Sequence, residues 1–168
     1  MDLARSRSTL RSLIGLSAVG LALAAVISIV PGSATPEQNW RPPAGYVLAD
    51  TVPLDDEHTL RLWTGSSGWY VESLLSGRHQ ATVGAMGGRD RYSVSEVLDA
   101  LVGELPAVGA TAVAVGSPTQ VRAEVHSGVF LVPASVIAAD DRTVSVVPLD
   151  VNGTALAPAI LVEVAGRS

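Results

Sequence analysis

The stretch "TLRLWTGSSGWYVESLL", residues 59–75, carries the strongest structural signal in this chain. Two runs rich in β-branched and aromatic residues flank Gly-Ser-Ser-Gly (65–68), which is typical of a hairpin loop. Folding the chain back about this loop sets four cross-strand pairs: Thr64 with Trp69, Trp63 with Tyr70, Leu62 with Val71, and Arg61 with Glu72. The stretch therefore predicts an antiparallel β-hairpin.

The pairing also sorts the side chains of this hairpin onto two faces, because strand side chains alternate. Leu60, Leu62 and Val71 share one face, which we expect to be the core side. The other face carries Trp63 beside Tyr70, and Arg61 opposite Glu72. Cross-strand pairs of these kinds each contribute a few tenths to about 1 kcal/mol.

Further short β-type runs, separated by turn residues, fill the rest of residues 45–168. They are "GYVLADTVPL" (45–54), "HQATVGAM" (79–86), "ATAVAV" (110–115), "QVRAEV" (120–125), "VFLVP" (129–133), "TVSVVPL" (143–149) and "ILVEV" (160–164). Many short strands at close spacing predict a mainly β fold, an antiparallel β-sandwich.

Two more hairpins are expected. A turn at Ser127-Gly128 would set Val125 opposite Phe130 and Ala123 opposite Val132. Phe130 is the single phenylalanine of the chain and a candidate core anchor. Asn152-Gly153 suits a turn that needs positive φ. The strand before it, 143–149, is apolar on both faces, which predicts a central position in its sheet.

One segment favours a helix instead. Val94, Val97, Leu98, Leu101 and Leu105 recur at helical spacing. Ser93 followed by Glu96 fits a capping box, in which each side chain bonds a free N–H of the other residue. We expect one short amphipathic α-helix at about 94–103, covering an open side of the sheets.

The N-terminal region predicts a membrane segment. Leu13–Val30 is uncharged and follows Arg5, Arg7 and Arg11, so residues 1–12 would stay in the cytoplasm and the chain after Val30 would lie outside. Its 18 residues span about 27 Å as a helix, enough for the hydrocarbon core. The alternative is a signal peptide cleaved near Ala34, which leaves a secreted protein.

The predicted helix 13–30 also presents small residues along one face. Gly20, Ala24 and Ser28 recur at four-residue spacing, which allows another membrane helix to approach closely. Residues 31–44 form a Pro-rich tether in extended geometry. The extracytoplasmic β-domain then occupies residues 45–168.

Composition excludes several classes of function. The chain has no cysteine, which removes disulfides, thiolate metal sites and a cysteine nucleophile. Its net charge is −5, and every basic residue is arginine. An acidic domain of this kind is unsuited to nucleic acid, since phosphate neutralisation needs a basic patch. Abundant Ala, Val and Gly without Lys indicates a G+C-rich bacterial source, such as an actinobacterium.

No motif for catalysis is found. The three histidines, His58, His79 and His126, form no metal-binding spacing, and no nucleophile elbow or phosphate loop occurs. Asp55-Asp56-Glu57-His58 offers oxygen ligands for a hard cation, but a solvated turn is the favoured interpretation. The same holds for the turn that begins at Asp150. We expect no enzyme activity, no cofactor and no metal.

The candidate binding surface is the pair Trp63 and Tyr70, with Arg61 and Glu72 beside them. Adjacent aromatic rings could stack on a sugar or form a protein hot spot. The alternative is that the chain itself covers the two rings, through Trp40-Arg41-Pro42-Pro43 or through the predicted helix.

The segment from Val121 to Gly153 resembles secreted or membrane-anchored actinobacterial proteins with an Ig-like β-sandwich. The residues that carry the resemblance are Val121, Arg122, Gly128, Phe130, Val144, Val146, Asp150 and Gly153. The resemblance covers about residues 107–158 and implies an Ig-like fold outside the membrane, without any shared activity. Cysteines frequent in the first half of such proteins are absent here.

Two functional hypotheses follow. The first is a non-enzymatic, membrane-anchored domain that binds another membrane or envelope protein as an accessory subunit. The second is a secreted module that binds cell-envelope glycan through Trp63 and Tyr70.

Overall fold

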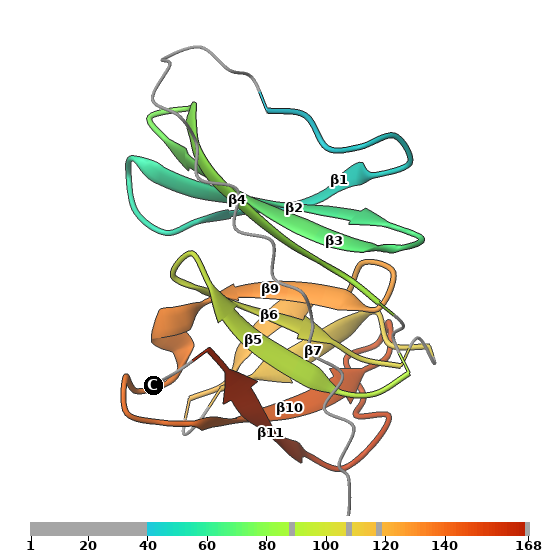
Figure 1. The fold of residues 1–168 in the computed structure, drawn as a ribbon. Coiled ribbons are helices and arrows are strands. Elements are labelled where there is room, and N and C mark those ends of the chain that lie inside the picture. The colour runs from blue at the N-terminus through green and yellow to red at the C-terminus, as the bar shows by residue number, and fades with distance from the viewer. Residues whose placement is uncertain (1–39, 88–89, 107–108, 117–118, 167–168) are drawn as a thin grey trace, which may run out of the picture.

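The computed structural model describes residues 40–87, 90–106, 109–116 and 119–166. These residues form eleven strands and one short 3₁₀ turn at Ala134–Val136, and they contain no α-helix. The strands form two sheets, and Figure 1 shows one stacked on the other. The mainly β prediction is confirmed. The predicted segment 13–30, with Gly20, Ala24 and Ser28, lies outside the described residues. Within the described ranges, no helix has the length and apolarity needed to cross a membrane.

The first sheet is an antiparallel meander in the order β1-β2-β3-β4. Its strands are Val47–Pro53, His58–Gly65, Gly68–Leu75 and Arg78–Met86. The register of β2 and β3 pairs Thr64 with Trp69, Trp63 with Tyr70, Leu62 with Val71, and Arg61 with Glu72. All four predicted pairs are confirmed. Leu60, Leu62 and Val71 are fully buried, so the predicted core face is confirmed too.

The second sheet has seven strands in the order β8-β7-β10-β11-β5-β6-β9. In chain order, β5 to β11 are Ser93–Val97, Ala100–Glu104, Ala112–Val115, Val121–Glu124, Val129–Pro133, Thr143–Leu149 and Ile160–Ala165. The sheet curls until its edge strands β8 and β9 contact each other. β10 lies between β7 and β11, as its two apolar faces predict. β11 and β5 are parallel, so the sheet is not purely antiparallel.

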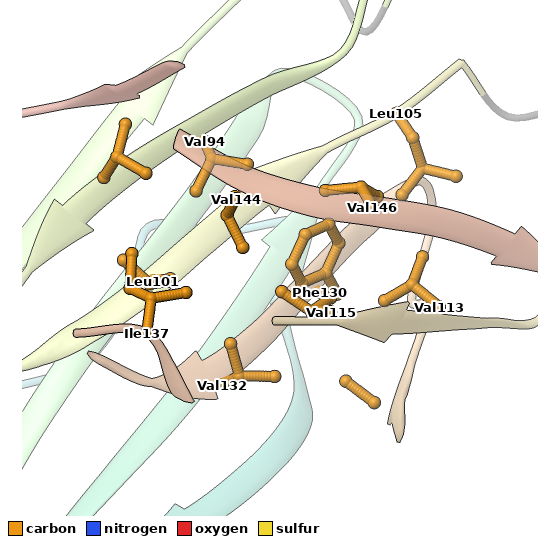
Figure 2. Close-up of a cluster of buried hydrophobic side chains, with 12 residues drawn as sticks. Val94, Leu101, Leu105, Val113, Val115, Phe130, Val132, Ile137, Val144 and Val146 are labelled. Atoms are coloured by element: carbon orange, nitrogen blue, oxygen red, sulfur yellow. The ribbon is translucent and has the colours of Figure 1, made fainter. Parts of the chain in front are cut away.

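Two hydrophobic cores result from this stacking. One lies between the first sheet and the strands β5, β6 and β9, and contains Leu60, Leu62, Val71, Val102 and Leu131. The other lies inside the curled sheet around Phe130, as Figure 2 shows. The middle strands β6 and β9 are therefore buried on both faces. Their nearly continuous apolar sequence follows from that position.

The helix predicted at 94–103 is wrong. These residues form the hairpin β5–β6, in which Val97 pairs with Ala100 and Val94 with Gly103. Strands buried on both faces are apolar at consecutive positions, and part of that pattern coincides with helical spacing. Ser93 forms no capping box, because its hydroxyl donates to the Glu104 carboxylate at 3.1 Å.

The pairing predicted for the Ser127-Gly128 hairpin is also wrong beyond the turn. His126 pairs with Val129, but β8 then continues along β7 and β9 along β6. β9 has four buried residues in succession and needs a layer on each side, whereas β8 buries only Ala123. The two strands therefore pair with different neighbours. Phe130 is fully buried, so its role as a core anchor is confirmed.

The β5–β6 turn gives the first testable prediction. Leu98 and Asp99 both have positive φ, +50° and +64°, which costs an L-residue about 1–2 kcal/mol. We expect Asp99→Gly to raise the free energy of unfolding by up to about 1 kcal/mol, because a two-residue turn of this type favours glycine there. Urea unfolding checks the sign. Within a helix the same substitution would lower stability by a few tenths of a kcal/mol, because Asp and Gly differ by about that much in helix propensity, so a loss would contradict the hairpin.

Candidate functional site

The outer face of the first sheet, turned away from the second sheet, carries a cluster of aromatic side chains. Trp63 on β2 and Tyr70 on β3 are direct cross-strand partners. Trp40 lies over both, with ring-centroid distances of 6.2 Å to Trp63 and 5.7 Å to Tyr70. Tyr46 joins at 4.8 Å from Tyr70, edge to face. We call these four residues and His79 the aromatic face.

Trp40 belongs to the segment predicted as a tether, and the structure places it on the sheet. Its ring stacks on the His79 imidazole, with a centroid distance of 6.0 Å and an interplanar angle of 12°. Trp40, Trp63 and Tyr70 are all half-buried. The sequence left open whether Trp40 covers the pair, and these contacts show that it does so in part.

A buried carboxylate lies beneath these rings. Glu72 is only 3% exposed, although its position in the hairpin suggested an outward residue. The Trp63 indole N–H donates to Glu72 Oε2 at 3.2 Å, and His79 Nδ1 lies 3.2 Å from Oε1. The Arg61 guanidinium approaches Oε2 to 3.8 Å and stays partly exposed. Glu72, on β3, thus forms side-chain contacts with both neighbouring strands, β2 and β4.

His79 is the member that sequence reasoning missed. It lies on β4, one strand beyond the hairpin, and an irregularity in the β3–β4 register separates the pair Ser73–Ala81 from Leu74–His79. Spacing alone cannot assign the face of a residue beside a bulge. The polar pair Arg61 and Glu72 could have pointed to His79, because a buried carboxylate needs more than one hydrogen-bond donor.

A close approach at Gly84 lets Tyr70 lie flat on the sheet. Gly84 is the β4 partner of Tyr70, and a Cβ at this glycine would overlap the Tyr70 ring. Burial raises the pKa of the Tyr70 hydroxyl above its ordinary value, and the Tyr46 hydroxyl adds to the shift. The ring is therefore held against the sheet and partly shielded from water.

This shielding gives a second prediction. Trp40→Ala should lower the pKa of Tyr70 toward its ordinary value, because the indole that covers the ring is removed. An NMR titration of labelled tyrosine, assigned with Tyr70→Phe, measures it. Leu48→Ala is the matched control, since Leu48 is 47% exposed and is the cross-strand partner of Trp63 on β1. An equal shift in both variants would show that Trp40 does not shield Tyr70.

The acidic turn at 55–58 forms its own internal hydrogen bonds. Asp55 Oδ1 accepts from the backbone N–H groups of His58 and Glu57, and Oδ2 lies 2.8 Å from His58 Nδ1. The backbone N–H groups of His58 and of Glu57 lower the pKa of Asp55, and the His58 side chain adds to this. Asp150 likewise accepts from Asn152 and Thr154. Among the described residues, no group of three His, Asp or Glu side chains is placed to hold a metal ion.

Comparison of the chain with protein-family models, with curated proteins and with solved structures found no significant match. The resemblance to Ig-like actinobacterial proteins over residues 107–158 therefore stays a prediction.

Proposed function

We propose that this protein is a non-enzymatic, extracytoplasmic interaction domain, held at the bacterial cell membrane by residues 13–30. In this proposal it is an accessory subunit that binds another membrane or envelope protein. The support from the sequence is the uncharged segment that follows three arginines. The Ig-like relationship over residues 107–158 belongs to the same proposal, since the proteins it points to act outside the membrane.

The observation that carries the proposal is the aromatic face. The chain has only seven aromatic residues, and four of them gather there: Trp40, Tyr46, Trp63 and Tyr70. The sheet does not need them for its own core, because its other face already packs on β5, β6 and β9. Half-exposed Trp and Tyr side chains are the residues that most often dominate the binding energy of protein interfaces.

The polar groups around the rings support the same proposal. Glu72 holds the Trp63 indole through its N–H, so this ring needs little further ordering when a partner binds. Arg61, partly exposed beside Glu72, supplies a charged group at the margin of the rings. An aromatic centre with a polar margin is the usual anatomy of a protein interface.

Glycan binding by Trp63 and Tyr70 is the alternative function. Stacking on a sugar needs a ring face that is open to solvent, and Trp40 already lies against both rings. These contacts favour a protein partner over a flat sugar platform. Binding to isolated cell wall that Trp63→Ala abolishes would reverse this preference.

Fractionation of the native host, followed by mass spectrometry of the intact protein, tests the membrane attachment. We expect the full-length chain in the membrane fraction. A chain that begins at Thr35 in the medium would show that residues 13–30 are removed, and the membrane-anchored proposal would fail.

Recovery of the full-length chain from mild detergent tests the partner surface. We expect a second protein to co-purify with the wild type and with Leu161→Ala, a control at an exposed residue of β11. Trp63→Ala should lose that protein while keeping the wild-type circular dichroism spectrum. Recovery of this chain alone, or equal recovery of the partner by Trp63→Ala, would contradict the proposal.

A further inference from the structure

The strand β4 has one hydrogen-bonding edge without a partner among the described residues. The Gly87 N–H donates to the Ser67 carbonyl at 3.2 Å, so Gly87 points toward β3. Because backbone groups alternate along a strand, the N–H and C=O groups of Thr82 and Gly84 point the other way. β4 is the last strand of its sheet, and no described strand lies on that side.

The other sheet edges carry features that discourage further pairing. β1 has an irregularity between Leu48 and Asp50 and ends at Pro53. β8 has four residues, two of them charged, and β9 lies against β1 and β8. β4 has nine residues and no proline; its one irregularity lies at Gln80, between the pairs Ser73–Ala81 and Leu74–His79, and from Ala81 to Met86 it is regular and uncharged. A long, uncharged edge strand is a template for pairing with another chain.

The sequence of β4 is compatible with antiparallel pairing to itself. A two-fold axis at Thr82 sets Thr82 opposite its own copy and Ala81 opposite Val83, within the regular part of β4. No pair in this register opposes two like charges, which would be destabilising. Thr82 also has the orientation that a hydrogen-bonded pair requires, since its N–H and C=O face the open edge.

We propose that β4 pairs with β4 of a second copy of this chain, in antiparallel register about Thr82. The two four-stranded sheets then become one continuous sheet. Cross-strand neighbours lie on the same face, so the two aromatic faces point to the same side. This dimer is independent of the proposed partner protein, since it uses the edge of the sheet and not its outer face.

Sedimentation of the full-length chain in detergent tests the dimer. We expect the protein mass to rise with concentration from 17.3 kDa toward twice that value. Thr82→Pro, which removes an open-edge N–H, should abolish the rise. Thr51→Pro is the control on the other edge of the sheet. The Leu54 N–H donates to His58 on β2, so by alternation Thr51 points to the open edge of β1, where its N–H donates only to the side chain of its neighbour, Asp50 Oδ1, at 2.7 Å. An equal loss in both variants would overturn the proposal.

Association through Gly20, Ala24 and Ser28 is the competing explanation for a dimer. Gly20→Leu should leave the mass unchanged if β4 forms the contact. A dimer that Gly20→Leu removes and Thr82→Pro retains would overturn the proposal, and so would a monomer at every concentration.

Crosslinking gives a test that does not depend on the folding of Thr82→Pro. The chain has no cysteine, so Thr82→Cys introduces a single thiol, and its oxidation should give a covalent dimer. In Gln80→Cys the Cα atoms of the two introduced cysteines would lie roughly 13 Å apart along the paired strands, which is too far for a disulfide. Gln80 is the more exposed of the two residues. Equal crosslinking of both variants would therefore indicate random collision and contradict the register.

Discussion

Replacing Phe130 with alanine is expected to lower the free energy of unfolding by about 3–5 kcal/mol, the usual range for a large buried aromatic residue. Phe130 is fully buried and lies at the centre of the core inside the curled sheet (Figure 2). Branched side chains from the surrounding strands enclose it, and they cannot close the cavity without moving backbone. Urea unfolding of the full-length chain measures the change.

Leu161→Ala is the control for this experiment. Leu161 is 73% exposed on β11, so its truncation should change the free energy of unfolding by less than about 0.5 kcal/mol. For Phe130→Ala, a loss below about 1 kcal/mol would contradict the position of Phe130 in the core, since buried aromatic residues cost several times that.

Gly103→Ala is expected to have the second large effect. Gly103 on β6 is the direct partner of Phe130 on β9, and a Cβ at this glycine would overlap the Phe130 ring. The ring must shift within a filled core, which costs about 1–3 kcal/mol or more. Urea unfolding again measures the loss.

A double variant shows whether the ring is the cause. In Gly103→Ala combined with Phe130→Leu, the new methyl group enters space that the ring has left. We expect the combined loss to be smaller than the sum of the single losses by about 1–3 kcal/mol. Additive losses would mean that Gly103 is needed for some reason other than contact with Phe130.

The hairpin β2–β3 could be predicted residue by residue because its sequence alternates cleanly. One face is apolar, and a short loop of glycine and serine fixes the register. A shift by one residue would move every apolar side chain to the wrong face, so only one register is acceptable. The position of Phe130 followed from its size and from its place within an apolar strand.

The hairpin β5–β6 could not be predicted because it lies in the middle layer. Ala100, Leu101 and Val102 are all buried, since they face two different cores. Such a run has no period of two, and part of it fits a helix. Leu98 is also an unusual residue at positive φ, so the turn gave little sequence signal.

The candidate site was predicted in part. Trp63, Tyr70, Arg61 and Glu72 share a face as the hairpin pairing requires, and Trp40 contacts the two aromatic rings among them. The burial of Glu72 depends on His79, which reaches it from β4, and on the rings above. Contacts that reach beyond one hairpin cannot be obtained from alternation alone.

Photo-crosslinking in the native host tests most directly whether the aromatic face is a partner surface. A benzophenone amino acid placed at position 63 should give an adduct with a second membrane or envelope protein, whereas the same group at position 161 should not. We expect this adduct in the membrane fraction. Absence of any adduct at position 63, or the same adduct at both positions, would contradict the proposed function.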